Sequence, residues 1–139
     1  MNRPNRTVFL ALVTGLLLAT FWIRITNLYD APLALHRDEA QNLHRAWRLI
    51  SDLGHPLLFG DNPEPFDAIA RAPYYALVGV MPFTGRLFST FLQVIAVAAT
   101  VAVARALFWR HPARDWIALI AGLALAVNPS FVVMGRGVY

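Results

Sequence analysis

Residues 7–23, TVFLALVTGLLLATFWI, decide the fold, because this stretch is apolar almost throughout and carries no charged side chain. A helix that crosses the hydrocarbon core of a bilayer needs about 20 mainly apolar residues, within a range of roughly 17–25. Two further stretches meet the same requirement, residues 87–104 and residues 116–134. The sequence therefore predicts an all-α membrane protein with three transmembrane helices.

The composition supports a membrane protein and excludes several other classes. Of the 139 residues, 58% are hydrophobic and only 14% are charged, whereas a soluble domain carries about 25% charged residues. A soluble globular enzyme and a disordered chain are both excluded on this ground. The absence of cysteine excludes disulfide scaffolds, zinc knuckles and thiol catalysis. The net charge of +4 comes from scattered Arg residues without any Lys, so nucleic acid is not an expected partner.

The distribution of Arg predicts the orientation in the membrane. Arg3 and Arg6 precede the first apolar stretch, as in a signal peptide, but no A-x-A cleavage site follows, so we interpret residues 7–23 as an uncleaved signal anchor. The connection 105–115 is short and dense in Arg, whereas the connection 24–86 is long and also carries acids. The positive-inside rule then places the N-terminus and residues 105–115 in the cytoplasm and residues 24–86 outside. We expect a multi-pass protein of the plasma (inner) membrane.

The long outer loop is expected to contain one or two juxtamembrane helices. Residues 38–53 have the periodicity of an amphipathic helix, with Trp47 on its apolar face and at the level of the lipid headgroups. Residues 72–83 are apolar but too short to span a bilayer, and Pro73 and Pro82 bound them. We interpret this second segment as interfacial or re-entrant.

Small residues recur at helical spacing in the second and third spans. Ala98 and Ala102 form one pair, and Ala118, Gly122 and Ala126 form a longer stripe. Small side chains allow transmembrane helices to approach closely. The alternative is that the stripes reflect only a generally Ala-rich composition.

The segment His36-Arg37-Asp38-Glu39-Ala40 follows the first span and carries the strongest chemical signal. An ionised Asp38 can accept a proton from a hydroxyl nucleophile, and Asp38 and Glu39 can share a divalent cation, with His36 as a weaker candidate ligand. The structural alternative is that Asp38 caps the amphipathic helix, with Gln41 completing a pattern like a capping box. The two roles are compatible.

Three Arg residues are predicted on the outer side near membrane level, Arg71, Arg86 and Arg136. Each can bind a lipid phosphate through charge-assisted hydrogen bonds, and the alternative is that each only extends to the headgroups. Tyr74 either belongs to an aromatic belt or lines a substrate groove. The sequence contains no Gly-rich nucleotide-binding loop.

The order of these features resembles the N-terminal part of the GT-C membrane glycosyltransferases, in particular the protein mannosyltransferase and aminoarabinose transferase-like enzymes. The resemblance is carried by the segments RAPYY at 71–75, GRLFS at 85–89 and NP at 128–129, together with the Asp38-Glu39 pair behind the first span. It implies transfer of a sugar from a polyprenyl-phosphate carrier to a glycan, lipid or protein acceptor outside the cytoplasm.

The resemblance also implies roles for individual residues. Asp38 matches the acidic residue near the acceptor nucleophile, and Glu39 would support it or help to hold a cation. Arg71 matches a basic residue near the carrier phosphate, and Arg86 matches a recurrent Arg whose role is less defined. Relatives of this kind are several times longer, so we expect the chain to be an N-terminal fragment. The alternative is a small three-span scaffold or lipid-carrier-binding protein without catalysis.

Overall fold

The computed structural model describes residues 4–26, 44, 47 and 65–136, and within these every regular element is an α-helix. The chain divides into two compact units, residues 1–26 with 90–135 and residues 27–89 with 136–139. Helices α1 (Arg6–Ile25) and α4 (Pro82–Leu107) are each long and apolar enough to cross a membrane. These two helices contain the first and second predicted spans, and they indicate a membrane protein.

The residues that flank helix α1, Asn5 and Thr26, form hydrogen bonds at its two ends. The Asn5 side chain accepts a hydrogen bond from the backbone N–H of Thr7 at 3.5 Å, which satisfies one of the unpaired N–H groups at the helix start. Thr26 adopts an extended conformation after Ile25, and its backbone N–H donates to the Trp22 carbonyl at 3.0 Å. Much of the apolar surface of α1 remains exposed, including Leu18 and Trp22, as expected of a helix that faces lipid.

The third predicted span, residues 116–134, is not one continuous helix. Helix α5 (Arg114–Val127) has only 14 residues, and α6 (Pro129–Arg136) follows after a break at Asn128. Pro129 restricts Asn128 to an extended conformation, and the Asn128 side chain caps α6 by accepting from the Phe131 N–H at 3.2 Å. An Asn-Pro pair thus ends one helix and starts the next, which divides this apolar stretch.

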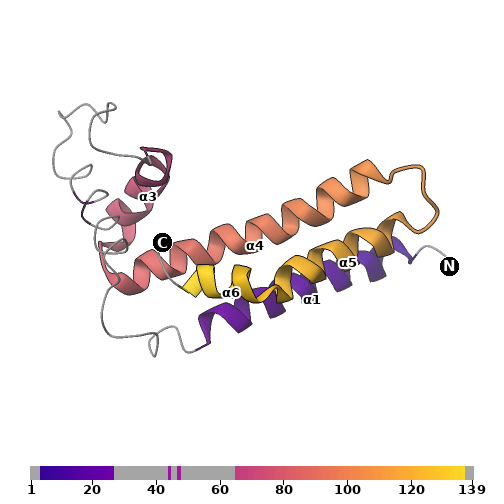
Figure 1. Cartoon of the computed structure of the whole chain (residues 1–139), viewed down its shortest axis with the longest axis horizontal. Coiled ribbons are helices and arrows are strands. Elements are labelled where there is room, and N and C mark those ends of the chain that lie inside the picture. The colour runs from indigo at the N-terminus through magenta and orange to yellow at the C-terminus, as the bar shows by residue number, and fades with distance from the viewer. Residues whose placement is uncertain (1–3, 27–43, 45–46, 48–64, 137–139) are drawn as a thin grey trace. The chain divides into compact units, whose positions relative to one another are not determined.

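Helices α1, α4 and α5 run side by side in alternating directions in the first unit (Figure 1). The core at one end contains Phe9 of α1, Val101 of α4 and Ala118 of α5. A Cβ atom built on Gly122 would lie 2.4 Å from Val101 Cγ2 and 3.1 Å from Leu16 Cδ2, so only glycine fits this close approach. The three helices are therefore packed through the smallest side chains of α5.

The predicted small-residue stripe of α5 is confirmed, and the pair on α4 is not. Ala118, Gly122 and Ala126 are all buried. Ala98 is half-buried and Ala102 is exposed. The buried positions of α4 next to this pair are Val97 and Val101 instead, so the branched side chains of α4 fit against the small side chains of α5. The stripe serves packing within the chain.

In the second unit, α3 (Pro65–Val78) precedes the start of α4, and the predicted segment 72–83 is not a single element. Pro73 lies inside α3 rather than at its boundary, although a proline at an internal position removes one helical hydrogen bond. Gly79 ends α3 with a φ of +86°, a conformation that side chains other than glycine rarely adopt.

The start of α4 is defined by a proline and by a side-chain cap from Thr84. Pro82 occupies the first helical position, where a missing N–H costs nothing. Thr84 Oγ1 accepts a hydrogen bond from the Met81 N–H at 3.0 Å and lies 2.9 Å from the Gly79 carbonyl. This arrangement is the return half of a capping box, and it fixes the turn that joins α3 to α4.

Candidate functional site

The predicted acidic site, His36, Asp38 and Glu39, lies outside the described residues. Of the predicted amphipathic helix 38–53, the structure describes His44 and Trp47, which are both helical and exposed. Their rings stack with centroids 6.2 Å apart, as residues three apart on one helix face can. Within the described part of the chain, no group of three His, Asp or Glu side chains is arranged to hold a metal ion.

Arg71, predicted to contact a phosphate, is buried at the contact between α3 and the first turns of α4. Its guanidinium donates to the Gly85 carbonyl at 3.3 Å and to Ser89 Oγ at 3.4 Å, and its Cζ lies 5.1 Å from the centre of the Phe88 ring. Only 4% of its surface is exposed. Arg71 is therefore a fixed cation inside the second unit, and it is not an extended surface side chain.

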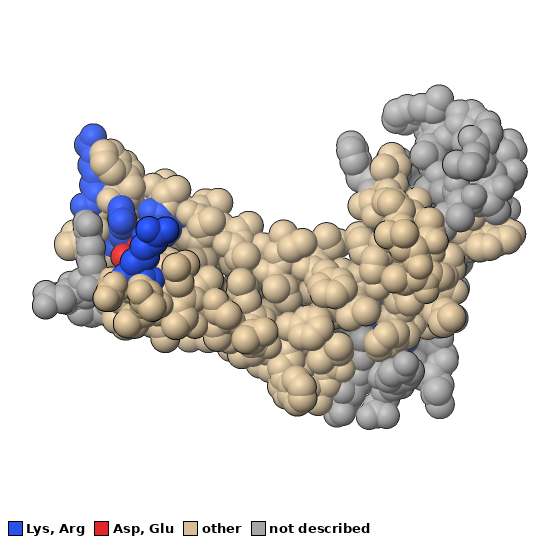
Figure 2. Space-filling view, turned by 180° about the vertical axis from the view of Figure 1, so that it is seen from behind, with Lys and Arg blue, Asp and Glu red and all other residues tan. Residues whose placement is uncertain are grey.

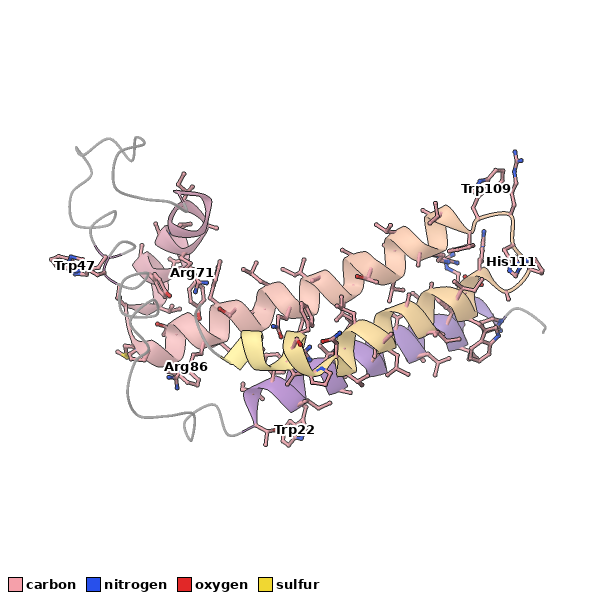
Figure 3. The ribbon with its side chains drawn as sticks, viewed as in Figure 1. Trp22, Trp47, Arg71, Arg86, Trp109 and His111 are labelled. Carbon is pink, nitrogen blue, oxygen red and sulfur yellow. The ribbon has the colours of Figure 1, made fainter. Side chains whose placement is uncertain are left out.

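Tyr74 follows Arg71 by three residues on α3. Arg86 lies on α4 next to Gly85, whose carbonyl accepts a hydrogen bond from Arg71. The Tyr74 ring packs against the Phe88 ring with centroids 5.2 Å apart, so Tyr74 and Arg71 share a neighbour. Burial raises the pKa of the Tyr74 phenol above its ordinary value. Arg86 is also buried, and Figure 3 shows it on the opposite side of the α4 ribbon from Arg71. The backbone of Arg136 ends α6, and its side chain lies outside the described part.

Another buried arginine is Arg24, which the sequence pattern assigns to the outer loop. It belongs to α1 instead and is 0% exposed. Its Nε donates to Gln93 Oε1 of α4. Its Nη1 donates to the Thr20 carbonyl at 3.1 Å, and its Nη2 donates to the Ala126 carbonyl of α5 at 3.2 Å. Arg24 thus joins the three main helices of the first unit at one point.

The break between α5 and α6 explains why Arg24 is held there. The Ala126 carbonyl is one of the last four of α5 and has no partner within that helix. A cation at a helix C-terminus also interacts favourably with the helix dipole. Gln93 donates from its Nε2 to the Phe131 carbonyl of α6, and the Phe131 ring lies 5.2 Å from Arg24 Cζ. We call Arg24, Gln93, Ala126 and Phe131 the Arg24 centre.

Two signals in the sequence point to the Arg24 centre. Gln93 is the only side chain with an amide or a charge in the second apolar stretch, and such a group in a membrane helix needs a partner. Asn128-Pro129 interrupts the third stretch and leaves carbonyl groups that need donors. Neither signal identifies Arg24 as the common partner, because that depends on how α1, α4 and α5 pack.

The buried arginines Arg24 and Arg71 differ in what they can do chemically. Arg24 is engaged by three helices through groups on all sides of its guanidinium, which suits a role in packing. Arg71 holds one carbonyl and one hydroxyl through its two terminal nitrogens, at 3.3–3.4 Å. Charge-assisted hydrogen bonds to an anionic oxygen are shorter and stronger than these two contacts.

No family model matches the chain, and neither a curated protein nor a solved structure matches it. The fold and the positions of the arginines are therefore the basis for any functional assignment.

Proposed function

We propose that the protein is a glycosyltransferase, or the N-terminal part of one, that transfers a sugar from a polyprenyl-phosphate carrier to an acceptor outside the cytoplasm. The proposal includes a third membrane crossing formed by α5 and α6 together, with the N-terminus in the cytoplasm. The observation that supports it most directly is Arg71, a buried cation fixed beside the start of an apolar helix.

In the proposed reaction, the acceptor oxygen forms a bond to the anomeric carbon as the bond to the carrier phosphate breaks. Asp38 takes the proton from the acceptor hydroxyl, and Glu39 assists. Negative charge grows on the departing phosphate, and Arg71 stabilises it as a preorganised donor. Arg86, Arg136 and Tyr74 are assigned to the binding of the carrier and sugar. A divalent cation, if the enzyme uses one, is held by Asp38 and Glu39 with His36, because carboxylate oxygens suit such ions.

The test is a transfer assay with membranes from cells that produce the protein from its own gene. Asp38→Asn is expected to lower the transfer rate by about a hundredfold or more, since a positioned general base contributes about 10²–10⁴. Asp52→Asn and Asp61→Asn, in the same predicted outer loop, are matched controls that should leave the rate unchanged. Equal amounts of each protein in the membrane are checked by immunoblot.

Arg71 is tested in the same assay with two substitutions. Arg71→Lys keeps the charge and should lose part of the rate, whereas Arg71→Gln should cost about a hundredfold, as for other donors to a developing anion. A full transfer rate in Asp38→Asn would contradict the role of Asp38. If the unmodified protein binds the carrier phosphate but transfers no sugar, the protein is a non-catalytic carrier-binding protein and the proposed enzyme activity is wrong.

A further inference from the structure

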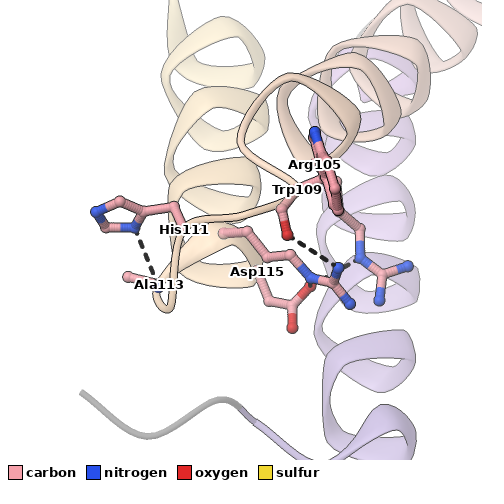
Figure 4. A network of polar contacts seen from close by, with 6 residues as sticks. Arg105, Trp109, His111, Ala113 and Asp115 are labelled. Atoms are coloured by element: carbon pink, nitrogen blue, oxygen red, sulfur yellow. Dashed lines mark hydrogen bonds and ion pairs between the residues drawn. The ribbon is translucent and has the colours of Figure 1, made fainter.

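The turn between α4 and α5 is a hydrogen-bonded, positively charged structure at one end of the first unit. The His111 N–H donates to the Phe108 carbonyl at 2.8 Å, and the Arg114 N–H donates to the His111 carbonyl at 3.2 Å. The His111 side chain accepts from the Ala113 N–H through Nδ1 at 3.1 Å (Figure 4). These bonds define the backbone conformation of the turn and the position of the His111 side chain.

The Arg residues of this end outnumber its acids. Arg105 Nε lies 2.7 Å from Asp115 Oδ1, and Arg114 Nε lies 3.6 Å from the same oxygen. Arg105 also packs over the Phe9 ring near the start of α1, where Arg6 is exposed. The face seen in Figure 2 has its described Arg side chains gathered at this end around one acid. A single carboxylate is shared, so the end keeps an excess of positive charge.

Arg110 differs from the other arginines of this end because it is directed to the outside. It is exposed, and among the described residues its one contact is with the Trp109 ring, whose centre lies 4.5 Å from Cζ. The side chains next to it are apolar and also exposed, Leu107 by 73%, Phe108 by 41% and Trp109 by 58%. A cation supported by an aromatic ring thus lies next to a group of exposed apolar side chains.

We propose that this turn binds the headgroup of an anionic phospholipid in the membrane leaflet that it faces. Arg110 donates to the lipid phosphate through its planar guanidinium. Trp109 lies at headgroup level, where tryptophan is favoured, and Leu107 and Phe108 contact the acyl chains. A lipid is favoured over a soluble anion because only a lipid covers the exposed apolar side chains. The inference does not depend on the transferase activity, since it concerns the opposite end of α4 from Arg71.

The experiment measures which lipid lies next to Trp109. A variant that keeps Trp109 alone, with Trp22, Trp47 and Trp116 changed to Phe, is placed in vesicles of phosphatidylcholine containing brominated phosphatidylglycerol or brominated phosphatidylcholine. The brominated phosphatidylglycerol should quench Trp109 with about fivefold higher apparent affinity, because one basic residue near an anionic surface contributes about that factor. The preference should fall at high salt. A variant that keeps Trp22 alone is the matched control and should show no preference.

Two Arg110 variants test the residue itself. Arg110→Gln should remove the fivefold preference, and Arg110→Lys should keep part of it, because lysine retains the charge without the planar fork. Native mass spectrometry of the protein with all four tryptophans should show fewer retained phosphatidylglycerol molecules in Arg110→Gln than in the unmodified protein. Equal quenching by both lipids at Trp109, or unchanged lipid retention in Arg110→Gln, would overturn the proposal.

Discussion

The two ends of the helix bundle hold arginine in opposite ways. At the Arg24 centre, a fully buried guanidinium donates to backbone carbonyls and an amide of three helices. At the other end, the Arg105 side chain is 41% exposed and pairs with the carboxylate of Asp115. The partner groups are buried at both ends, since the Asp115 side chain is only 6% exposed, so the two ends differ in the exposure of the guanidinium itself. We expect this exposure to decide how much each arginine contributes, because contact with water weakens an ion pair.

The largest expected effect comes from removing the buried arginine. Arg24→Met keeps most of the side-chain volume, but it removes the hydrogen-bond donor to the Ala126 carbonyl and to the amide oxygen of Gln93. We expect a loss of about 2–4 kcal/mol in the free energy of unfolding, as for other broken buried networks. The measurement is unfolding by sodium dodecyl sulfate in mixed micelles, followed by circular dichroism. A loss below that of the Arg105 variant described below would reverse the comparison between the two ends.

An intermediate effect is expected between the two ends, at the close approach of α5. Gly122→Ala places a Cβ 2.4 Å from Val101 Cγ2, and valine has little freedom to move away. Such overpacking should cost about 1–3 kcal/mol in the same unfolding measurement.

Gly15→Ala is the matched control for Gly122, because Gly15 lies inside α1 and nothing lies within 4 Å of its added Cβ. It should stabilise the protein by about 0.5–1 kcal/mol, the ordinary difference between alanine and glycine in a helix. Equal effects of the two substitutions would show that the buried stripe of α5 is not tightly packed.

The smallest effect is expected at the exposed end. Arg105→Gln removes a guanidinium that is 41% exposed from the buried carboxylate of Asp115, so the loss should be about 0.5–1 kcal/mol after solvent screening. Asp115 keeps the neighbouring Arg114 and its favourable place in the first turn of α5. The loss should shrink further at high salt, whereas the Arg24→Met effect should not change with salt. A salt-independent loss at Arg105 would show that this pair is as isolated from solvent as Arg24.

The sequence predicts the helices of this protein better than their ends and contacts. The long apolar stretches at 7–23 and 87–104 require helices in a membrane, and both are found. The apolar pattern of the sequence predicts residues 116–134 as one span, although Asn128-Pro129 lies inside it, and the structure divides the stretch into two helices there. Hydropathy is averaged over a window of many residues, so it does not register that one residue, Pro129, lacks a backbone N–H.

The arginines show the same limit at the candidate site. Their sequence positions beside apolar stretches predict residues near the membrane ends, and they do not indicate that Arg24, Arg71 and Arg86 are buried. Burial depends on which carbonyls, hydroxyls and rings the packing of α1, α3, α4 and α5 brings to each guanidinium. The proposed roles of Asp38 and Glu39 remain predictions, since these residues lie outside the part of the chain that the structure describes.

The break between α5 and α6 has a consequence for how the protein is made. Backbone groups released at such a break are tolerated at membrane depth only where protein covers them. Here the donors come from Arg24 of α1 and Gln93 of α4, which are synthesised before the break leaves the ribosome. For the proposed third crossing, we therefore expect insertion to depend on the first two helices, and a ribosome-bound chain that lacks Arg24 should release this stretch into the bilayer less efficiently.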